Sequence, residues 1–159
     1  MSHTPTAQSW RVFLALVIGA ALVVTPACAQ FDPDLAAERG YRVVSVANGL
    51  SEPWGMAFLP GGDLLVTEKA GRLRILRDGR LLPDPVAGVP EVHARGQGGL
   101  LDVAIHPAFA TNRQVYLTYS KPLAGGESTT ALIRGTLEGD RLTDVEELFV
   151  AESRGRGHY

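Results

Sequence analysis

Hydrophobic and polar residues alternate over short runs along most of this chain, and no stretch keeps apolar residues at helical spacing for three turns. The runs are rich in Val, Leu, Ile, Thr and Tyr and are separated by Gly, Pro and Asp, a pattern that predicts an all-β fold. We expect strands at 42–47, 55–59, 64–69, 72–76, 100–107, 115–121, 129–137 and 145–151.

Turn residues separate several of the early predicted strands. Pro60-Gly61-Gly62-Asp63 lies between 55–59 and 64–69, and Arg77-Asp78-Gly79-Arg80 follows 72–76. Glycine provides backbone conformations in such turns that other residues resist. The sequence therefore predicts that the first four strands form one antiparallel unit.

A second unit repeats this pattern. The run "GMAFLP" begins at Gly55 and "DVAIHP" begins at Asp102, 47 residues later, and an aliphatic strand follows each. A period of about 40 to 50 residues with four strands per repeat is typical of β-propeller blades. A β-sandwich also has short strands, but it does not lead us to expect this repeat. We therefore predict a partial β-propeller, with about two to three blades in this chain.

The number of blades bears on the completeness of the domain. Propellers usually close with about four to eight blades, because a blade buries both of its faces only against neighbours. We therefore expect this chain to be the first part of a longer protein, with further blades beyond Tyr159.

The first thirty residues have a different composition. Arg11 precedes the apolar run Val12–Val24, and small residues follow up to Ala29, which predicts a secretory signal peptide over 1–29. The run is shorter than the ~20 residues that a membrane-spanning helix needs. We therefore expect no membrane span and a periplasmic or secreted domain at 30–159. A lipoprotein acylated at Cys28 is the less favoured alternative, because the residues before it fit such a signal poorly.

Charge argues against a nucleic-acid partner. Fifteen Lys and Arg are scattered among seventeen Asp and Glu, for a formal net charge of −2. Nucleic-acid binding leaves a basic patch, and the sequence contains none.

Two common types of site are not predicted in this chain. His93, His106 and His158 are isolated from one another and no calcium-binding loop occurs, so we expect no metal held by this segment alone. The glycine-rich run at 96–102 lacks the preceding strand and following helix of a dinucleotide site. We expect packed, hydrogen-bonded structural roles for Asp102 and His106 and a solvated side chain for His93.

Two polar residues are candidates for chemistry. Gln97 lies in a loop that enters a predicted inner strand, where propellers bind ligands, but the residues alone favour a solvated turn. His158 could act as a general base, and glycines at 155 and 157 would let a ligand approach closely. By position alone, a histidine so near a terminus is more often without a catalytic role.

Three long runs carry a resemblance to a known family. They are "LSEPWGMAFLPGGDLLVTEKAGRLRIL", "PVAGVPEVHARGQGGLLDVAIHPAFATNRQVYLTYS" and "TALIRGTLEGDRL". In this order they resemble the first blades of the glucose/sorbosone dehydrogenase family, which includes soluble glucose dehydrogenases and aldose sugar dehydrogenases. The resemblance implies a six-bladed propeller that carries pyrroloquinoline quinone (PQQ), supported by calcium, and oxidises the C1 hydroxyl of aldose sugars to lactones.

The resemblance also implies roles for the two candidates. His158 corresponds to the catalytic base and Gln97 to a substrate contact, while the residues that hold PQQ and calcium are expected beyond Tyr159. The cofactor-binding residues of this chain are therefore unknown, and we expect little or no activity from the chain alone. Some glucose dehydrogenases have an aspartate where this chain has Gly157, which favours broad aldose use.

The sequence does not identify the electron acceptor. It also leaves open an alternative function, a non-enzymatic propeller that binds protein or carbohydrate partners, in which His158 has no role.

Overall fold

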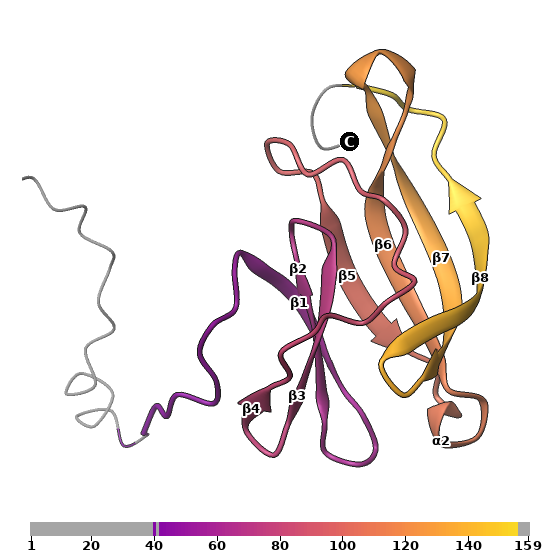
Figure 1. Ribbon diagram of the computed structural model, residues 1–159. Coiled ribbons are helices and arrows are strands. Elements are labelled where there is room, and N and C mark those ends of the chain that lie inside the picture. The colour runs from indigo at the N-terminus through magenta and orange to yellow at the C-terminus, as the bar shows by residue number, and fades with distance from the viewer. Residues whose placement is uncertain (1–39, 41, 156–159) are drawn as a thin grey trace, which may run out of the picture. The chain divides into compact units, whose positions relative to one another are not determined.

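Two four-stranded antiparallel sheets make up the part of the chain described by this computed structural model, residue 40 and residues 42–155. In each sheet the strands lie side by side in sequence order (Figure 1). The first sheet contains β1 (Pro53–Phe58), β2 (Leu64–Glu68), β3 (Arg72–Arg77) and β4 (Arg80–Leu81). The second contains β5 (Leu100–Ile105), β6 (Gln114–Pro122), β7 (Ser128–Glu138) and β8 (Arg141–Val150). The short helix α2 (Phe109–Asn112) and the 3₁₀ turn η1 (Ala124–Gly126) flank β6.

A tight turn determines which segment completes the first sheet. Asp78 and Gly79 have φ angles of 50° and 71°, as the two central residues of a type I′ hairpin turn require. This turn returns the chain along β3 as β4, with Arg77 paired to Arg80.

The predicted strand at 42–47 is wrong. The described residues of this segment form no strand, and Val44 and Val46 remain 56% and 63% exposed. The first sheet has two edge strands, β1 and β4, but the described residues of this segment pair with neither, and alternation alone does not make a strand.

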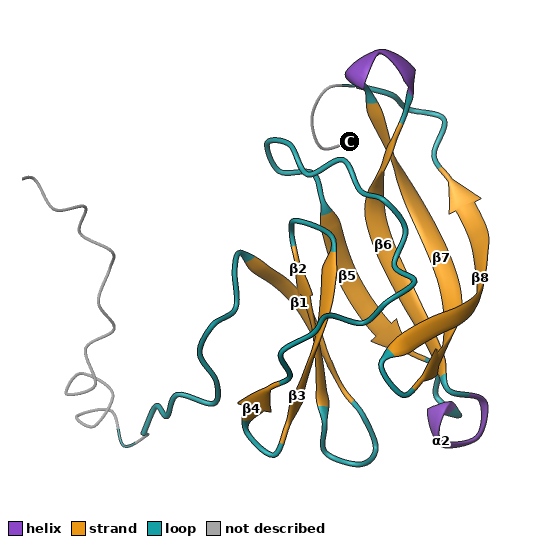
Figure 2. Ribbon diagram, in the orientation of Figure 1, coloured by secondary structure: helices purple, strands orange, loops and turns teal. Residues whose placement is uncertain are grey.

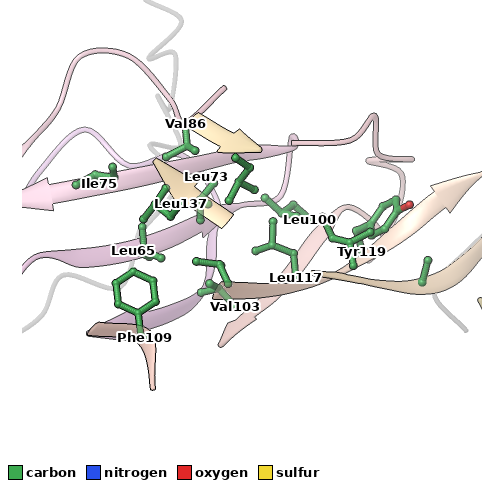
Figure 3. Packing of buried hydrophobic residues seen from close by; sticks show 14 residues of the cluster. Leu65, Leu73, Ile75, Val86, Leu100, Val103, Phe109, Leu117, Tyr119 and Leu137 are labelled. Carbon is green, nitrogen blue, oxygen red and sulfur yellow. The ribbon is translucent and has the colours of Figure 1, made fainter. Parts of the chain in front are cut away.

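The core lies between the two sheets. Alternate residues of a strand point to one face, and the apolar faces of β2 and β3 meet those of β5, β6 and β7 (Figure 3). Val86 in the connecting loop and Phe109 in α2 also belong to this cluster. The buried members are Leu65, Leu73, Ile75, Val86, Leu100, Val103, Phe109, Val115, Leu117, Tyr119, Ala131, Ile133, Leu137 and Leu142.

The first strands of the two sheets approach each other closely. A Cβ atom on Gly55 of β1 would lie 2.6 Å from Oδ1 of Asp102 in β5. Both strands also carry an irregularity at the same place in the repeat, since pairing shifts between Pro53 and Met56 and again between Leu100 and Val103. The 47-residue repeat is therefore structural. The two sheets are successive propeller blades with β1 and β5 as their inner strands, which confirms the predicted fold class.

Each blade has an apolar face outside this shared core. Met56 and Phe58 of β1 are 66% and 70% exposed, and Phe149 of β8 is 56% exposed. Such faces are expected of blades, which bury both sides only between neighbours.

Part of the sequence-based prediction lies outside the described residues. This applies to the signal peptide at 1–29, including Cys28 and the expected cleavage after Ala29. Among the residues that are described, no helix is long and apolar enough to cross a membrane.

Candidate functional site

The loop from His93 to Gly99 carries the first candidate residue, Gln97. This loop enters β5, the inner strand of the second blade, and Gln97 is exposed beside Gly96. Gly96 has a φ of 58°, a conformation that glycine adopts without strain. The Gln97 side chain is therefore exposed to solvent in a turn that precedes the inner strand β5.

Ser120 of β6 binds both ends of this loop. Its carbonyl oxygen accepts a hydrogen bond from the His93 amide at 2.8 Å, and its own amide donates to the Gly99 carbonyl at 2.8 Å. Its side-chain Oγ also accepts from the Gly99 amide at 3.2 Å. Ser120 is 3% exposed, so water does not compete effectively for these bonds.

The loop is also fixed against the first blade. The Leu100 amide donates to the Lys69 carbonyl at 3.0 Å, just beyond the end of β2. Gly99 has a φ of 154°, and a Cβ atom there would lie 2.2 Å from that same carbonyl oxygen. Only glycine fits at this position, because any side chain would collide with backbone.

The segment that leads to the second candidate, His158, is bound to β7. Oγ1 of Thr129 donates to the carbonyl oxygens of Ala151 and Ser153 at 2.8 and 2.6 Å. Ser128 and Gly155 exchange two backbone hydrogen bonds of 2.7 and 3.1 Å. His158 itself lies outside the described residues, three positions after Gly155.

The two anchor points are neighbours. In the pairing of β6 with β7, Lys121 lies opposite Thr129, and Ser120 immediately precedes Lys121. The loop that enters β5 and the turn η1 are found at this same end of the second sheet (Figure 2). The structure therefore anchors the Gln97 loop and the segment leading to His158 at one end of adjacent strands.

A buried carboxylate stabilises the first blade near this end. Glu68 is fully buried and accepts hydrogen bonds from the Ser51 amide at 2.6 Å, Nε of Arg72 at 2.5 Å and Nη1 of Arg74 at 3.4 Å. Burial raises the pKa of Glu68, but these hydrogen bonds and the Arg72 charge outweigh it and hold the pKa below its ordinary value of 4.5.

A second carboxylate lies in the other blade. Glu147 of β8 accepts from Nζ of Lys121 at 2.6 Å and from the Tyr119 hydroxyl at 3.5 Å. Burial of the Tyr119 ring, together with the Glu147 charge, raises the pKa of Tyr119 above 10.0.

Several cations near this end already have carboxylate partners. Lys69 pairs with Glu52 at 3.1 Å, Arg72 with Glu68 at 2.5 Å, and Lys121 with Glu147 at 2.6 Å. Each of these three cations is therefore paired with a carboxylate of the described chain. The exposed amide of Gln97 is a polar group at this end that a ligand can reach.

The other sequence candidates have local roles. Nδ1 of His106 accepts from the Ala108 amide at 3.0 Å, and the His106 ring stacks on Tyr116 with centroids 6.4 Å apart. Asp102 is exposed, and its Oδ1 accepts from the neighbouring Val103 amide at 2.9 Å. The hydrogen-bonded structural role predicted for Asp102 is confirmed, but its predicted packing is wrong, because Asp102 lies on the exposed face of β5 together with Ala104.

The prediction that His93 is solvated is also wrong. Its ring is half-buried, and its Nε2 atom is buried without a hydrogen-bond partner among the residues placed by the structure. The backbone bond to Ser120 draws the residue in against β6. Within the same described part of the chain, no three His, Cys, Asp or Glu side chains gather closely enough to hold a metal ion.

Two successive four-stranded antiparallel blades define this chain as part of a β-propeller. The sequence model of the family described as Glucose / Sorbosone dehydrogenase matches residues 50–159. The chain belongs to this family, which confirms the resemblance seen in its sequence.

Curated relatives agree with this assignment. An uncharacterized protein of Synechocystis is 45% identical over 127 residues, which cover 74% of this chain and 31% of that protein. The aldose sugar dehydrogenase YliI of Escherichia coli K12 is 40% identical over 117 residues, covering 72% and 32%. The chain thus spans about a third of the length of these relatives.

Solved structures are similar as well. A crystal structure of a glucose dehydrogenase superposes with a TM-score of 0.68 at 42% identity, over 72% of this chain and 34% of that one. The PQQ-bound form of an aldose sugar dehydrogenase from Streptomyces coelicolor superposes with a TM-score of 0.59 at 30% identity, over 69% and 33%.

Sequence reasoning missed the residues that anchor the two candidate segments. Ser120 and Thr129 were not singled out, because small hydroxyl residues are common in strands and no sequence pattern distinguishes these two. The signal for Ser120 appears only in the structure, where its burial next to the buried Tyr119 interrupts the alternation of β6.

Proposed function

We propose that this chain carries the sugar-facing part of a PQQ-dependent aldose dehydrogenase, which oxidises the C1 hydroxyl of aldoses to lactones with calcium as a supporting ion. One observation carries the proposal. The Gln97 loop and the segment that leads to His158 are anchored side by side on β6 and β7, through Ser120 and Thr129. The PQQ-bound relative and the aldose sugar dehydrogenase relative support it.

The proposed chemistry divides between these two residues. A neutral imidazole at His158 takes the proton of the C1 hydroxyl, while the C1 hydrogen leaves with its electron pair as hydride and the C1–O bond becomes a carbonyl. The amide of Gln97 can both donate to and accept from sugar hydroxyls, so it orients the ring. When bound, PQQ supplies the acceptor for the hydride. Glycine at 157, where some glucose dehydrogenases have an aspartate, favours oxidation of a broad range of aldoses.

The test uses a chimera, because the chain spans about a third of its relatives. Residues 50–159 replace the matching segment of the E. coli aldose sugar dehydrogenase, and aldose-dependent dye reduction is measured with PQQ and calcium. We expect turnover that His158→Ala lowers by roughly 10²- to 10⁴-fold, the usual contribution of a general base. Gln97→Ala should raise KM more than it lowers kcat.

His106→Ala is the matched control, since this histidine is engaged by Ala108 and Tyr116. It should leave kcat within about twofold, as expected for a residue outside the chemistry. Turnover that survives His158→Ala would exclude this residue as the base. A folded chimera without aldose-dependent turnover would favour the non-enzymatic propeller. The chain alone, given PQQ and calcium, should show no turnover.

We also propose that the domain is exported after cleavage near Ala29. Amino-terminal sequencing of the protein recovered from a periplasmic fraction tests this, and a mature chain that retains residues 1–29 would contradict it.

A further inference from the structure

Two buried hydroxyl groups on adjacent strands bind loops instead of their own sheet. Ser120 of β6 and Thr129 of β7 are each 3% exposed. The Ser120 hydroxyl contacts the loop before β5, and the Thr129 hydroxyl contacts the chain after β8. Buried hydroxyls need partners, and here the partners belong to the two segments on which the proposed site depends.

Ser120 holds the two ends of the Gln97 loop together. His93 and Gly99, the two ends of the loop, both bond to this one residue. A substitution at position 120 would keep the two backbone bonds, but it would remove the hydroxyl that accepts a hydrogen bond from the Gly99 amide. The contact is close, since a Cβ atom on Gly98 would lie 2.9 Å from Oγ of Ser120.

Thr129 anchors the other segment, the chain after β8 that leads to His158. Its single hydroxyl hydrogen is shared between the carbonyls of Ala151 and Ser153, so it fixes the course of the chain just after β8. The backbone bonds between Ser128 and Gly155 follow immediately. Together these contacts define where the chain departs, three residues before His158.

We infer that Ser120 and Thr129 are positioning residues for the proposed dehydrogenase reaction. Ser120 sets the place of Gln97 and hence sugar binding. Thr129 holds residues 151–153 of the chain that leads to His158 and hence affects proton transfer. Neither residue touches the substrate. The inference rests on the proposed function, and it adds that substrate contact and base are held by separate hydroxyls on adjacent strands.

Amide hydrogen exchange of the whole chain tests the anchoring without any assay of activity. Ser120→Ala should speed exchange of the Gly99 amide by at least about tenfold and leave Gly155 unchanged, since one lost hydrogen bond opens one loop. Thr129→Val should do the reverse, and Thr129→Ser should restore protection. Ile133→Val changes the core of the same sheet and is the control. It should not speed exchange of one of these two amides more than the other. Equal exchange at Gly99 and Gly155 in all variants, or no protection of them in the parent chain, overturns the inference.

Kinetics in the chimera test the division of roles. Ser120→Ala should raise the KM for aldose by about tenfold or more and leave the pH profile of kcat unchanged, because small misplacements of a binding group are costly. Thr129→Val should lower kcat by about tenfold and shift that pH profile, because it releases the anchored chain that leads to the proposed base. Thr129→Ser should recover both.

The outcomes separate the two proposals. A parent chimera that folds and shows no aldose-dependent turnover overturns the proposed function and this inference with it. An active chimera in which both substitutions change KM and kcat alike, or change neither, overturns this inference alone.

Discussion

Oγ1 of Thr67 in the first blade donates a hydrogen bond of 2.5 Å to the carbonyl oxygen of Leu101 in the second blade. The same Oγ1 accepts from the Gly55 amide at 2.8 Å, so one fully buried hydroxyl connects β1, β2 and β5. The second blade repeats half of this arrangement, because Oγ1 of Thr118 accepts from the Asp102 amide at 3.0 Å. The internal repeat thus extends from sequence to hydrogen bonding.

Thr67→Val should destabilise the protein. It keeps the shape of the side chain but leaves the Leu101 carbonyl and the Gly55 amide without their partner, at a cost of about 1–3 kcal/mol for an unsatisfied buried group. Urea unfolding measures the change. Thr118→Val is the matched control, and its effect should be smaller, because Thr118 is half-buried and Asp102 is exposed to water. Equal losses would show that the contact between blades adds nothing.

Glu68→Gln should lower the free energy of unfolding at neutral pH by about 3 kcal/mol, the usual cost of breaking a buried ion pair. The amide cannot compensate the charge of Arg74, which is only 9% exposed. Glu146→Gln, at an exposed pair with Arg134, should cost less than about 1 kcal/mol. A comparable loss in both variants would contradict the buried role of Glu68.

Lowering the pH should remove the contribution of Glu68 to the free energy of unfolding. Its pKa is lowered in the folded state, so its contribution to stability is complete above the ordinary value of 4.5 and is lost as pH falls through the lowered pKa. Unfolding measured from pH 7 to pH 3 should therefore show the parent and Glu68→Gln converging only below about pH 4.5. A constant difference over this range would contradict the lowered pKa.

Gly99→Ala should destabilise the loop that carries Gln97. A Cβ atom would collide with the Lys69 carbonyl, and the φ of 154° strains any other residue. The loss in thermal unfolding should exceed the ~1 kcal/mol effect of an ordinary glycine substitution. Gly61→Ala is the control, since a Cβ atom there meets nothing within 4 Å, and it should be neutral or slightly stabilising. The opposite ranking would show that the loop does not pack against Lys69.

The phenol of Tyr119 should ionise at a higher pH than that of an exposed tyrosine. Its pKa is raised above 10.0, so the neutral phenol stabilises the fold at lower pH, and this contribution is lost as pH rises through the raised pKa. Absorbance titration of the parent and of Tyr119→Phe identifies its step. Glu147→Gln should bring that step to lower pH, because the carboxylate opposes the phenolate. No movement of the step would show that Glu147 has no part in the shift.

Local patterns accounted for most of the fold. Seven of the eight predicted strands form, because alternating apolar residues and turn glycines act within a few positions along the chain. The turn at Asp78-Gly79 was predicted for the same reason. The strand at 42–47 failed although its pattern was suitable, because a strand also needs a neighbour to pair with, and a local pattern does not reveal which segments pair.

The candidate residues divide in a similar way. The family resemblance singled out Gln97 and His158, and their roles stay predictions. The hydrogen bonding predicted for Asp102 was confirmed, but its predicted packing was wrong, because its side chain lies on the exposed face of β5 together with Ala104. The tertiary structure decides which face of a strand is covered, and the sequence of one strand does not reveal it.

By itself, the sequence determined the strands, the 47-residue repeat and the family, because these depend on neighbouring residues and on runs long enough to be specific. Only the tertiary structure decided that Thr67 connects the blades and that Ser120 and Thr129 hold the two candidate segments. Those bonds join residues 21 to 34 positions apart. They exist only once sheet register brings the distant partners within reach.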